Sequence, residues 1–137
     1  FFQYMIANTD WGISSKHNLE IVKLNDKNLI LGIPYDFDFS GFVGHKYAVP
    51  SEKIPIQSIH DRYFFPYEVS ESEFNELVEY YQSMKGTILD TIQNATYMDV
   101  KEIQRCESYV QTYYYLLDNP KRLKKSIIKK SIKMYKF

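Results

Sequence analysis

The sequence predicts an α+β fold that is mainly helical. Residues 19–24 alternate apolar and polar and include β-branched residues, and residues 29–33 form a second, apolar run after the turn-forming segment 25–28; this pattern is typical of a β-hairpin. From residue 70 on, apolar residues recur at steps of three and four, which is typical of helices with one buried face. With 137 residues and a hydrophobic fraction of 45%, the chain has the size and apolar content of one domain. We therefore expect a hairpin packed on a helical bundle.

The segment 1–42 is expected to hold a helix end, a polar loop and the hairpin. Residues 1–7 are apolar and their helical pattern breaks at Asn8, whereas residues 9–18 are mostly polar. Pro34 ends the second strand. Because the chain starts without a Met and inside a helix-like apolar run, we expect it to be a fragment of a longer protein.

Residues 43–69 show no periodicity and carry Pro50, Pro55 and Pro66. They predict a long ordered loop with one helical turn near residues 56–60. Loops of this length inside a compact domain are usually functional. We therefore expect a substrate-binding or activation-type segment here.

Residues 70–137 predict helices that end in a basic tail. Ser70 and Glu73 have the capping-box pattern at the start of the first helix, and Asp99 and Glu102 repeat it at the start of the second. Gly86 predicts a bend, and a last helix is expected to begin at Asn119-Pro120. The expected buried positions are Phe74, Leu77, Val78, Tyr81, Met84, Ile88, Leu89, Ile92, Ile103, Cys106, Val110, Tyr113 or Tyr114, Leu117, Leu123, Ile127, Ile128 and Met134.

The formal net charge is zero, but the charges are unevenly distributed. All 17 acidic residues lie at or before Asp118, whereas the tail after Pro120 is basic and contains no acidic residue. Such a tail either binds an anionic partner, such as a membrane surface, a nucleic acid or a polyphosphate, or forms a solvated face that balances the acidic body. The basic residues of the tail are Lys121, Arg122, Lys124, Lys125, Lys129, Lys130, Lys133 and Lys136.

Hydropathy and cysteine content limit two further features. No apolar run approaches the roughly 18–20 residues that a membrane-spanning helix needs, so we expect no transmembrane segment in this chain. The single cysteine, Cys106, excludes an internal disulfide, and its place on an apolar helix face predicts a buried thiol. These features do not identify a compartment.

Four polar residues around the hairpin are the candidates for chemistry: Asp10, Asn18, Asp36 and Asp38. Asn18 directly precedes the first strand, and Asp36 follows the second. Because a hairpin brings its two ends together, these two residues are expected to be neighbours in space. Phosphoryl transfer uses such a set, since one Asp takes the proton of the acceptor hydroxyl while an Asn and a second Asp hold Mg²⁺ against the phosphates.

Three short motifs make up this region: Asn8-Thr9-Asp10-Trp11, then His17-Asn18, then Pro34-Tyr35-Asp36-Phe37-Asp38. The order of loop Asp, Asn, hairpin and Asp resembles the C-terminal lobe of the protein-kinase-like fold, in which a catalytic loop leads through two short strands to an Asp-Phe-Gly-type metal site. The motifs are most similar to those of the atypical kinases of the spore-coat CotH type and, more distantly, of the HipA type. The resemblance covers about residues 3–42.

The resemblance implies a role for each of these residues. Asp10 would be the catalytic Asp, Asn18 the metal-binding Asn and Asp36 the Asp of the Asp-Phe-Gly position, although Asp10 and Asn18 are farther apart than in the common kinase loop. Asp38, which replaces the usual Gly, would assist the metal. The implied cofactors are Mg²⁺ and ATP, and the acceptor is an unidentified hydroxyl. Since these residues include no Gly-rich phosphate loop and no strand Lys, the resemblance implies that an N-terminal half completes the site. The residues that would orient the loop are Asn8 and His17.

Other interpretations stay open. A non-catalytic binding or scaffold module of the same fold would use the loop 42–67 and the basic tail as contact surfaces, and the Asp and Asn residues would then only cap turns. Asp36 and Asp38, about 7 Å apart on an extended segment, would also suit a two-carboxylate glycoside hydrolase, but only scattered aromatic residues such as Trp11 would hold a sugar. A metal site built on histidines is not supported, because the three histidines are far apart in the sequence.

Overall fold

The computed structural model describes residues 1–125 and 127, which belong to two compact units. Residues 2–63 form the first, here called the hairpin unit. Phe1 and the chain from Phe64 on form the second, here called the helical unit. Since one unit contains a two-stranded antiparallel sheet and the other is built from helices, the α+β class is confirmed.

The hairpin unit begins with the short helix α1, Phe2–Met5, and the left-handed residue Ala7 lies two positions beyond its end. Ala7 has a φ of 49°, and its N–H donates to the carbonyl of Tyr4 while the N–H of Asn8 donates to that of Gln3. These two bonds define a Schellman motif, in which Gly is the usual left-handed residue. An alanine there costs about 1 kcal/mol or more, so this helix end is fixed by its surroundings.

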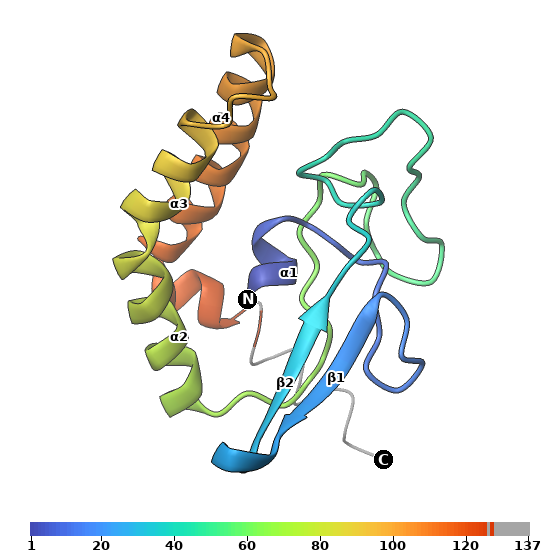
Figure 1. Cartoon of the computed structure of the whole chain (residues 1–137), viewed down its shortest axis with the longest axis vertical. Coiled ribbons are helices and arrows are strands. Elements are labelled where there is room, and N and C mark those ends of the chain that lie inside the picture. Colours follow the sequence, from blue (N-terminus) through green and yellow to red (C-terminus); the bar gives the residue numbers. More distant parts are fainter. Residues whose placement is uncertain (126, 128–137) are drawn as a thin grey trace. The chain divides into compact units, whose positions relative to one another are not determined.

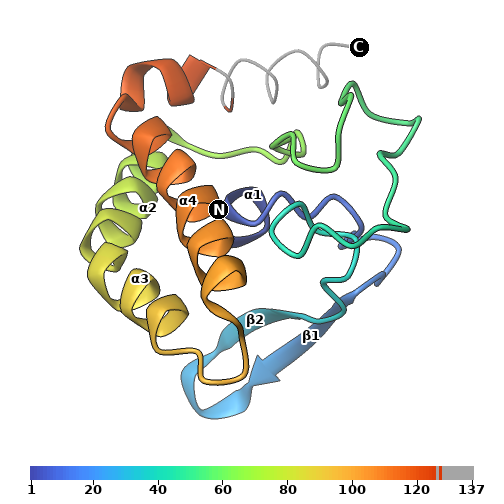
Figure 2. The same cartoon turned by 90° about the horizontal axis from the view of Figure 1, so that it is seen from above.

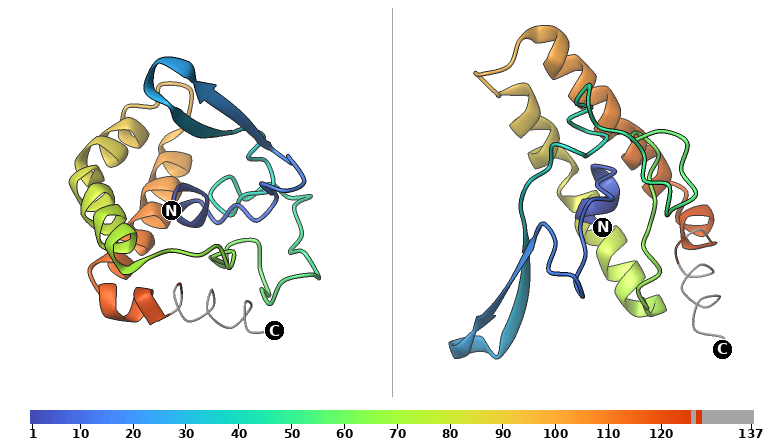
Figure 3. Two further views of the ribbon diagram at one scale, coloured as in Figure 1. Left: turned by 90° about the horizontal axis from the view of Figure 1, so that it is seen from below. Right: turned by 90° about the vertical axis from the view of Figure 1, so that its right-hand side faces the viewer.

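The predicted hairpin is present. Strand β1, Leu19–Leu24, pairs antiparallel with β2, Leu29–Pro34, and Leu19 faces Pro34 while Leu24 faces Leu29 (Figure 1). The expected turn is a single 3₁₀ turn, η1, Asn25–Lys27, which is completed by the left-handed Asn28 at a φ of 47°. The two strands form a twisted ribbon with the turn at its tip (Figure 3).

The helical unit contains α2, Glu71–Ser83, α3, Lys85–Gln93, and α4, Val100–Leu117, followed by the helical residues 120–125. Helix α4 runs antiparallel to α3 and lies beside it (Figure 2). The bend predicted at Gly86 lies at Met84, where a ψ of −3° opens the backbone between α2 and α3. Gly86 itself sits inside α3 with open space around it.

The core of the helical unit is aromatic. Tyr113 and Tyr114 are both buried, and the ring of Tyr113 contacts the ring of Tyr81 edge-on at 5.9 Å between centroids. Burial raises the pKa of Tyr81 to about 12. Cys106 is buried as predicted. The remaining buried residues of this unit are Phe74, Val78, Ala95, Val110, Leu117, Leu123 and Ile127.

Several expectations about local structure are corrected. Residues 56–60 form bends and a turn instead of a helical turn, and the carboxylate of Asp61 accepts the N–H groups of Gln57 and Ser58 there. Asp99 accepts the N–H of Glu102 as an N-cap, but no return bond of a capping box is formed within the described residues. The expected core positions Ile128 and Met134 lie outside the described residues, as does the basic tail after residue 127. In residues 1–125 and 127, no helix is both long and apolar enough to cross a membrane.

Candidate functional site

Asn8 is positioned by the end of α1. The Schellman motif turns the chain at Ala7, and the side chain of Asn8 is 1% exposed. Its Oδ1 accepts the backbone N–H of Asp10 at 2.9 Å, which is the geometry of an Asx turn. Asn8 therefore fixes the direction in which the chain leaves α1 and enters the loop that carries Asp10.

A closed turn separates Asp10 from Asn18. Gly12 and His17 exchange two backbone hydrogen bonds, of 3.0 and 3.1 Å, and Lys16 takes a left-handed conformation with a φ of 52°. A side chain at position 12 would meet the Oγ of Ser15 at 2.5 Å, and this exposed hydroxyl would have to rotate away. The long spacing between Asp10 and Asn18 is thus taken up by a turn whose two ends are adjacent.

Asp10, His17 and Asn18 are in direct contact. The Nδ2 of Asn18 donates to the backbone carbonyl of Asp10 at 2.8 Å and to its Oδ2 at 3.1 Å. The Nε2 of His17 lies 3.0 Å from Oδ1 of the same carboxylate. Both oxygens of Asp10 are therefore held, one by each neighbour. Asn18 is left-handed, with a φ of 49°, and its side chain is buried.

The second strand returns the chain to the same place. The N–H of Tyr35 donates to the carbonyl of Asn18, and the backbone of Asp36 then turns with a φ of 57°. Two further bonds anchor the segment that follows: the N–H groups of Gly41 and Phe42 donate to the carbonyls of Ala7 and Ile6. The backbones of Asn18 and Asp36 are therefore close, as predicted, because the carbonyl of Asn18 accepts the N–H of Tyr35, the residue directly before Asp36.

Asp36 and Asp38 interact with each other. The hydrogen bond with Asp38, and then the charge of Asp38, raise the pKa of Asp36, and the charge of Asp10 raises it further. The hydroxyl of Tyr47 donates to Oδ2 of Asp38 and lowers the pKa of that carboxyl. Asp36 and Asp38 thus form a carboxylate pair, and the charge of Asp10 also acts on Asp36.

Tyr47 is a member of this cluster that sequence reasoning missed. It lies in the segment predicted as a long loop, nine residues after Asp38. No periodicity or motif links the two positions, because their contact depends on how an irregular segment folds back. A tyrosine close in sequence to the paired aspartates was the available signal, and it is weak in a chain with 13 tyrosines.

The chemistry of the donor set fits a hard cation. Asp36, Asp38 and the Oδ1 of Asn18 are oxygen donors, which Mg²⁺ prefers, and convergent carboxylates repel one another unless a proton or a cation is present. Within residues 1–125 and 127, no three His, Cys, Asp or Glu side chains are already arranged as a metal-binding group. The structure brings Asp10, His17 and Asn18 together as one cluster and Asp36, Asp38 and Tyr47 as another, and the charge of Asp10 couples the two.

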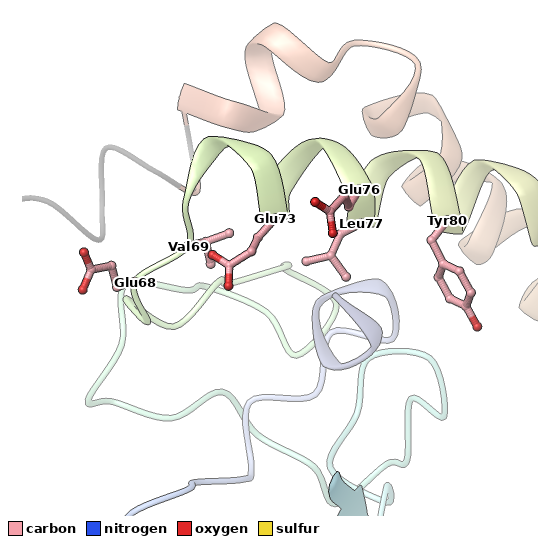
Figure 4. Close-up of a pocket in the computed structure, with 6 residues that line it drawn as sticks. All are labelled: Glu68, Val69, Glu73, Glu76, Leu77 and Tyr80. Atoms are coloured by element: carbon pink, nitrogen blue, oxygen red, sulfur yellow. The ribbon is translucent and has the colours of Figure 1, made fainter. Parts of the chain in front are cut away.

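An open groove lies elsewhere, in the helical unit. It has a volume of about 590 Å³ and is formed by α2 and the two residues Glu68 and Val69 before it. Figure 4 shows Leu77 and Tyr80 pointing to the same side of α2. Its lining shares no residue with the predicted site, so the groove and the aspartate clusters are separate features. The residues that line it are Glu68, Val69, Glu73, Glu76, Leu77 and Tyr80.

Comparison with protein-family models, with curated protein sequences and with solved structures gives no significant match for this chain.

Proposed function

We propose that this chain is the C-terminal-lobe part of an atypical kinase-like phosphotransferase, which transfers a phosphoryl group from Mg·ATP to a hydroxyl acceptor. The observation that carries the proposal is the arrangement at the base of the hairpin. Asn18 holds Asp10 by two hydrogen bonds, and Asp36 follows the backbone bond between Tyr35 and Asn18. This juxtaposition of loop Asp, Asn and post-strand Asp supports the proposal, because kinases use a catalytic Asp together with an Asn and a second Asp that hold Mg²⁺.

Asp10 acts on the acceptor. Its carboxylate oxygens are oriented by Asn18 and His17, and each retains a lone pair that can accept a proton. In the transfer step, the acceptor oxygen forms a bond to the γ-phosphorus and its proton passes to the carboxylate of Asp10. The bond between the γ-phosphorus and the bridging oxygen breaks, and ADP leaves with the electron pair.

Asp36, Asp38 and Asn18 are the oxygen donors that would hold Mg²⁺. The bound ion would neutralise charge on the phosphate oxygens. The raised pKa of Asp36 is consistent with this role, because the negative charges of Asp38 and Asp10 favour a positive charge beside Asp36. The parts that grip the nucleotide are expected outside these residues.

The first prediction tests the metal ligand. In the complete gene product assayed with ATP and Mg²⁺, Asp36→Asn is expected to lower kcat about 100-fold or more, as is usual when a pre-positioned electrostatic group is lost. Asp90→Asn removes an equal charge from α3 and is expected to leave kcat unchanged. Turnover that survives Asp36→Asn would rule out Asp36 as the metal ligand, whereas absence of turnover in the unsubstituted protein would favour a non-catalytic binding module.

A further inference from the structure

The segment after Asp38 folds back on it. The N–H of Ser40 donates to the carbonyl of Phe37, the N–H of Gly44 donates to that of Ser40, and Gly44 turns the chain with a φ of 65°. Ser40 is fully buried, and its Oγ accepts the N–H of Val43. These local bonds bring residue 47 back beside Asp38.

The ring of Tyr47 is held on two sides. It stacks on the imidazole of His45 at 3.8 Å between ring centroids, with an interplanar angle of 33°. The ring of Phe39 lies 5.6 Å away. Tyr47 is nonetheless 52% exposed, so burial alone does not fix its position. While the ring contacts His45 and Phe39, the hydroxyl donates to Oδ2 of Asp38.

We propose that Tyr47 is a positioning residue of the proposed metal site: its hydroxyl holds Oδ2 of Asp38, so that this carboxylate would already be oriented when a cation binds. This inference rests on the proposed function. An exposed aspartate samples several rotamers, and a donor that holds one of its oxygens removes that freedom before the cation arrives. Loss of such a supporting hydrogen bond typically weakens metal affinity ten- to hundredfold.

The second prediction tests this role by titrating the purified chain with Mn²⁺ and following the free ion by electron paramagnetic resonance. Tyr47→Phe keeps the ring and removes the hydroxyl, and it is expected to weaken Mn²⁺ binding about tenfold. Tyr80→Phe is the matched control, because Tyr80 is 57% exposed and is expected to leave the affinity unchanged. In an Asp38→Asn background, Tyr47→Phe is expected to have no further effect, since its action passes through Asp38.

Acetylation of tyrosine by N-acetylimidazole gives a readout that needs no metal. A hydroxyl engaged with a carboxylate reacts more slowly than a solvated one, so Tyr47 is expected to react more slowly than Tyr80, and Asp38→Asn is expected to bring the two rates together. Equal acetylation rates of Tyr47 and Tyr80 in the chain without substitutions would overturn the inference. Mn²⁺ binding that is indifferent to Tyr47→Phe would overturn it while leaving the metal site standing. Absence of Mn²⁺ binding would remove the metal site, and the positioning role with it.

Discussion

Three non-glycine residues in the left-handed conformation mark the turning points of the candidate site. Ala7 ends α1, Asn18 opens β1 and Asp36 follows β2, with φ values of 49°, 49° and 57°. Such a backbone costs an L-residue roughly 1–2 kcal/mol, and Asn and Asp tolerate it better than most residues. Strain of this kind persists only where neighbouring bonds impose it, and here those bonds are the contacts that align Asp10 and Asp36.

The third prediction separates strain from hydrogen bonding at Asn18. Asn18→Gly keeps the backbone and removes the bonds to Asp10, and is expected to lower the free energy of unfolding by about 1–3 kcal/mol. Asn18→Ala is expected to lower the free energy of unfolding by about 1–2 kcal/mol more, because alanine is strained in the left-handed conformation. Urea denaturation measures both changes.

Asn28 provides the control, because it has the same backbone conformation but is exposed at the tip of the hairpin. Asn28→Gly is expected to leave the stability almost unchanged, and Asn28→Ala to cost only the left-handed penalty. If glycine at positions 18 and 28 had the same effect, the bonds between Asn18 and Asp10 would contribute nothing to the fold.

Among single residues, the sequence predicts the contacts that follow from a regular element such as the hairpin. The neighbourhood of Asn18 and Asp36 follows from hairpin pairing alone. The contact of Tyr47 with Asp38 does not, because it depends on turns around Ser40 and Gly44 whose hydrogen bonds have no sequence period. Residue-level chemistry in irregular segments therefore needs the three-dimensional structure.

Helix α2 begins with a complete capping box. The N–H of Glu73 donates to the Oγ of Ser70 at 3.2 Å, and the N–H of Ser70 donates to Oε2 of Glu73 at 2.8 Å. Hydrogen bonds from the Ser70 side chain, and then from its backbone, lower the pKa of Glu73 below its ordinary value of 4.5. A carboxyl with a lowered pKa in the folded state stabilises the fold above the unfolded value and loses this contribution as the pH falls through the folded value.

The fourth prediction is a pH dependence of stability that belongs to this element. Below pH 4.5 the chain is expected to lose the contribution of Glu73, and Glu73→Gln is expected to show a shallower decline of Tm between pH 5 and about pH 3. Glu79→Gln, on the same helix but outside the capping box, is expected to decline like the unmodified chain. If Tm fell equally with pH in Glu73→Gln and in the unsubstituted chain, the Glu73 carboxylate would not contribute to stability through the capping box.

Elements with strong periodicity are predicted well, and their ends less so. Both strands and the start of α2 agree with the sequence pattern. The break between α2 and α3 was expected at Gly86 because glycine weakens helices, but a helix tolerates glycine where its flanking turns stay hydrogen-bonded. The N–H of Ile88 still reaches the carbonyl of Met84, so the backbone bends at Met84 instead.

The molecule divides its core unequally between its two units. Most fully buried side chains belong to the helical unit, among them Phe74, Tyr113 and Leu117, whereas the sheet of the hairpin unit is a single two-stranded ribbon. An isolated pair of strands is marginal in stability. Each unit has one unique probe, Trp11 in the hairpin unit and Cys106 in the helical unit.

The fifth prediction is that these probes report separate unfolding transitions in urea. Trp11 fluorescence is expected to change at a lower urea concentration than the reactivity of Cys106 towards a thiol reagent. Burial raises the pKa of the Cys106 thiol and covers it, so it reacts only after the helical unit opens. Far-ultraviolet circular dichroism, which mainly reports helices, should follow Cys106. Coincident midpoints for both probes would mean that the chain unfolds as one cooperative body.

The register of the hairpin determines where a peptide can be inserted without disturbing the candidate site. Asn18 and Tyr35 close the ribbon at one end, and six paired residues on each strand separate them from the Asn25–Asn28 tip. An insertion at the tip lengthens the ribbon outward and leaves the pairing of Leu19 with Pro34 untouched. The tip is therefore the natural place for a foreign peptide, such as an epitope tag or a spectroscopic label, that must not disturb the aspartates at the base.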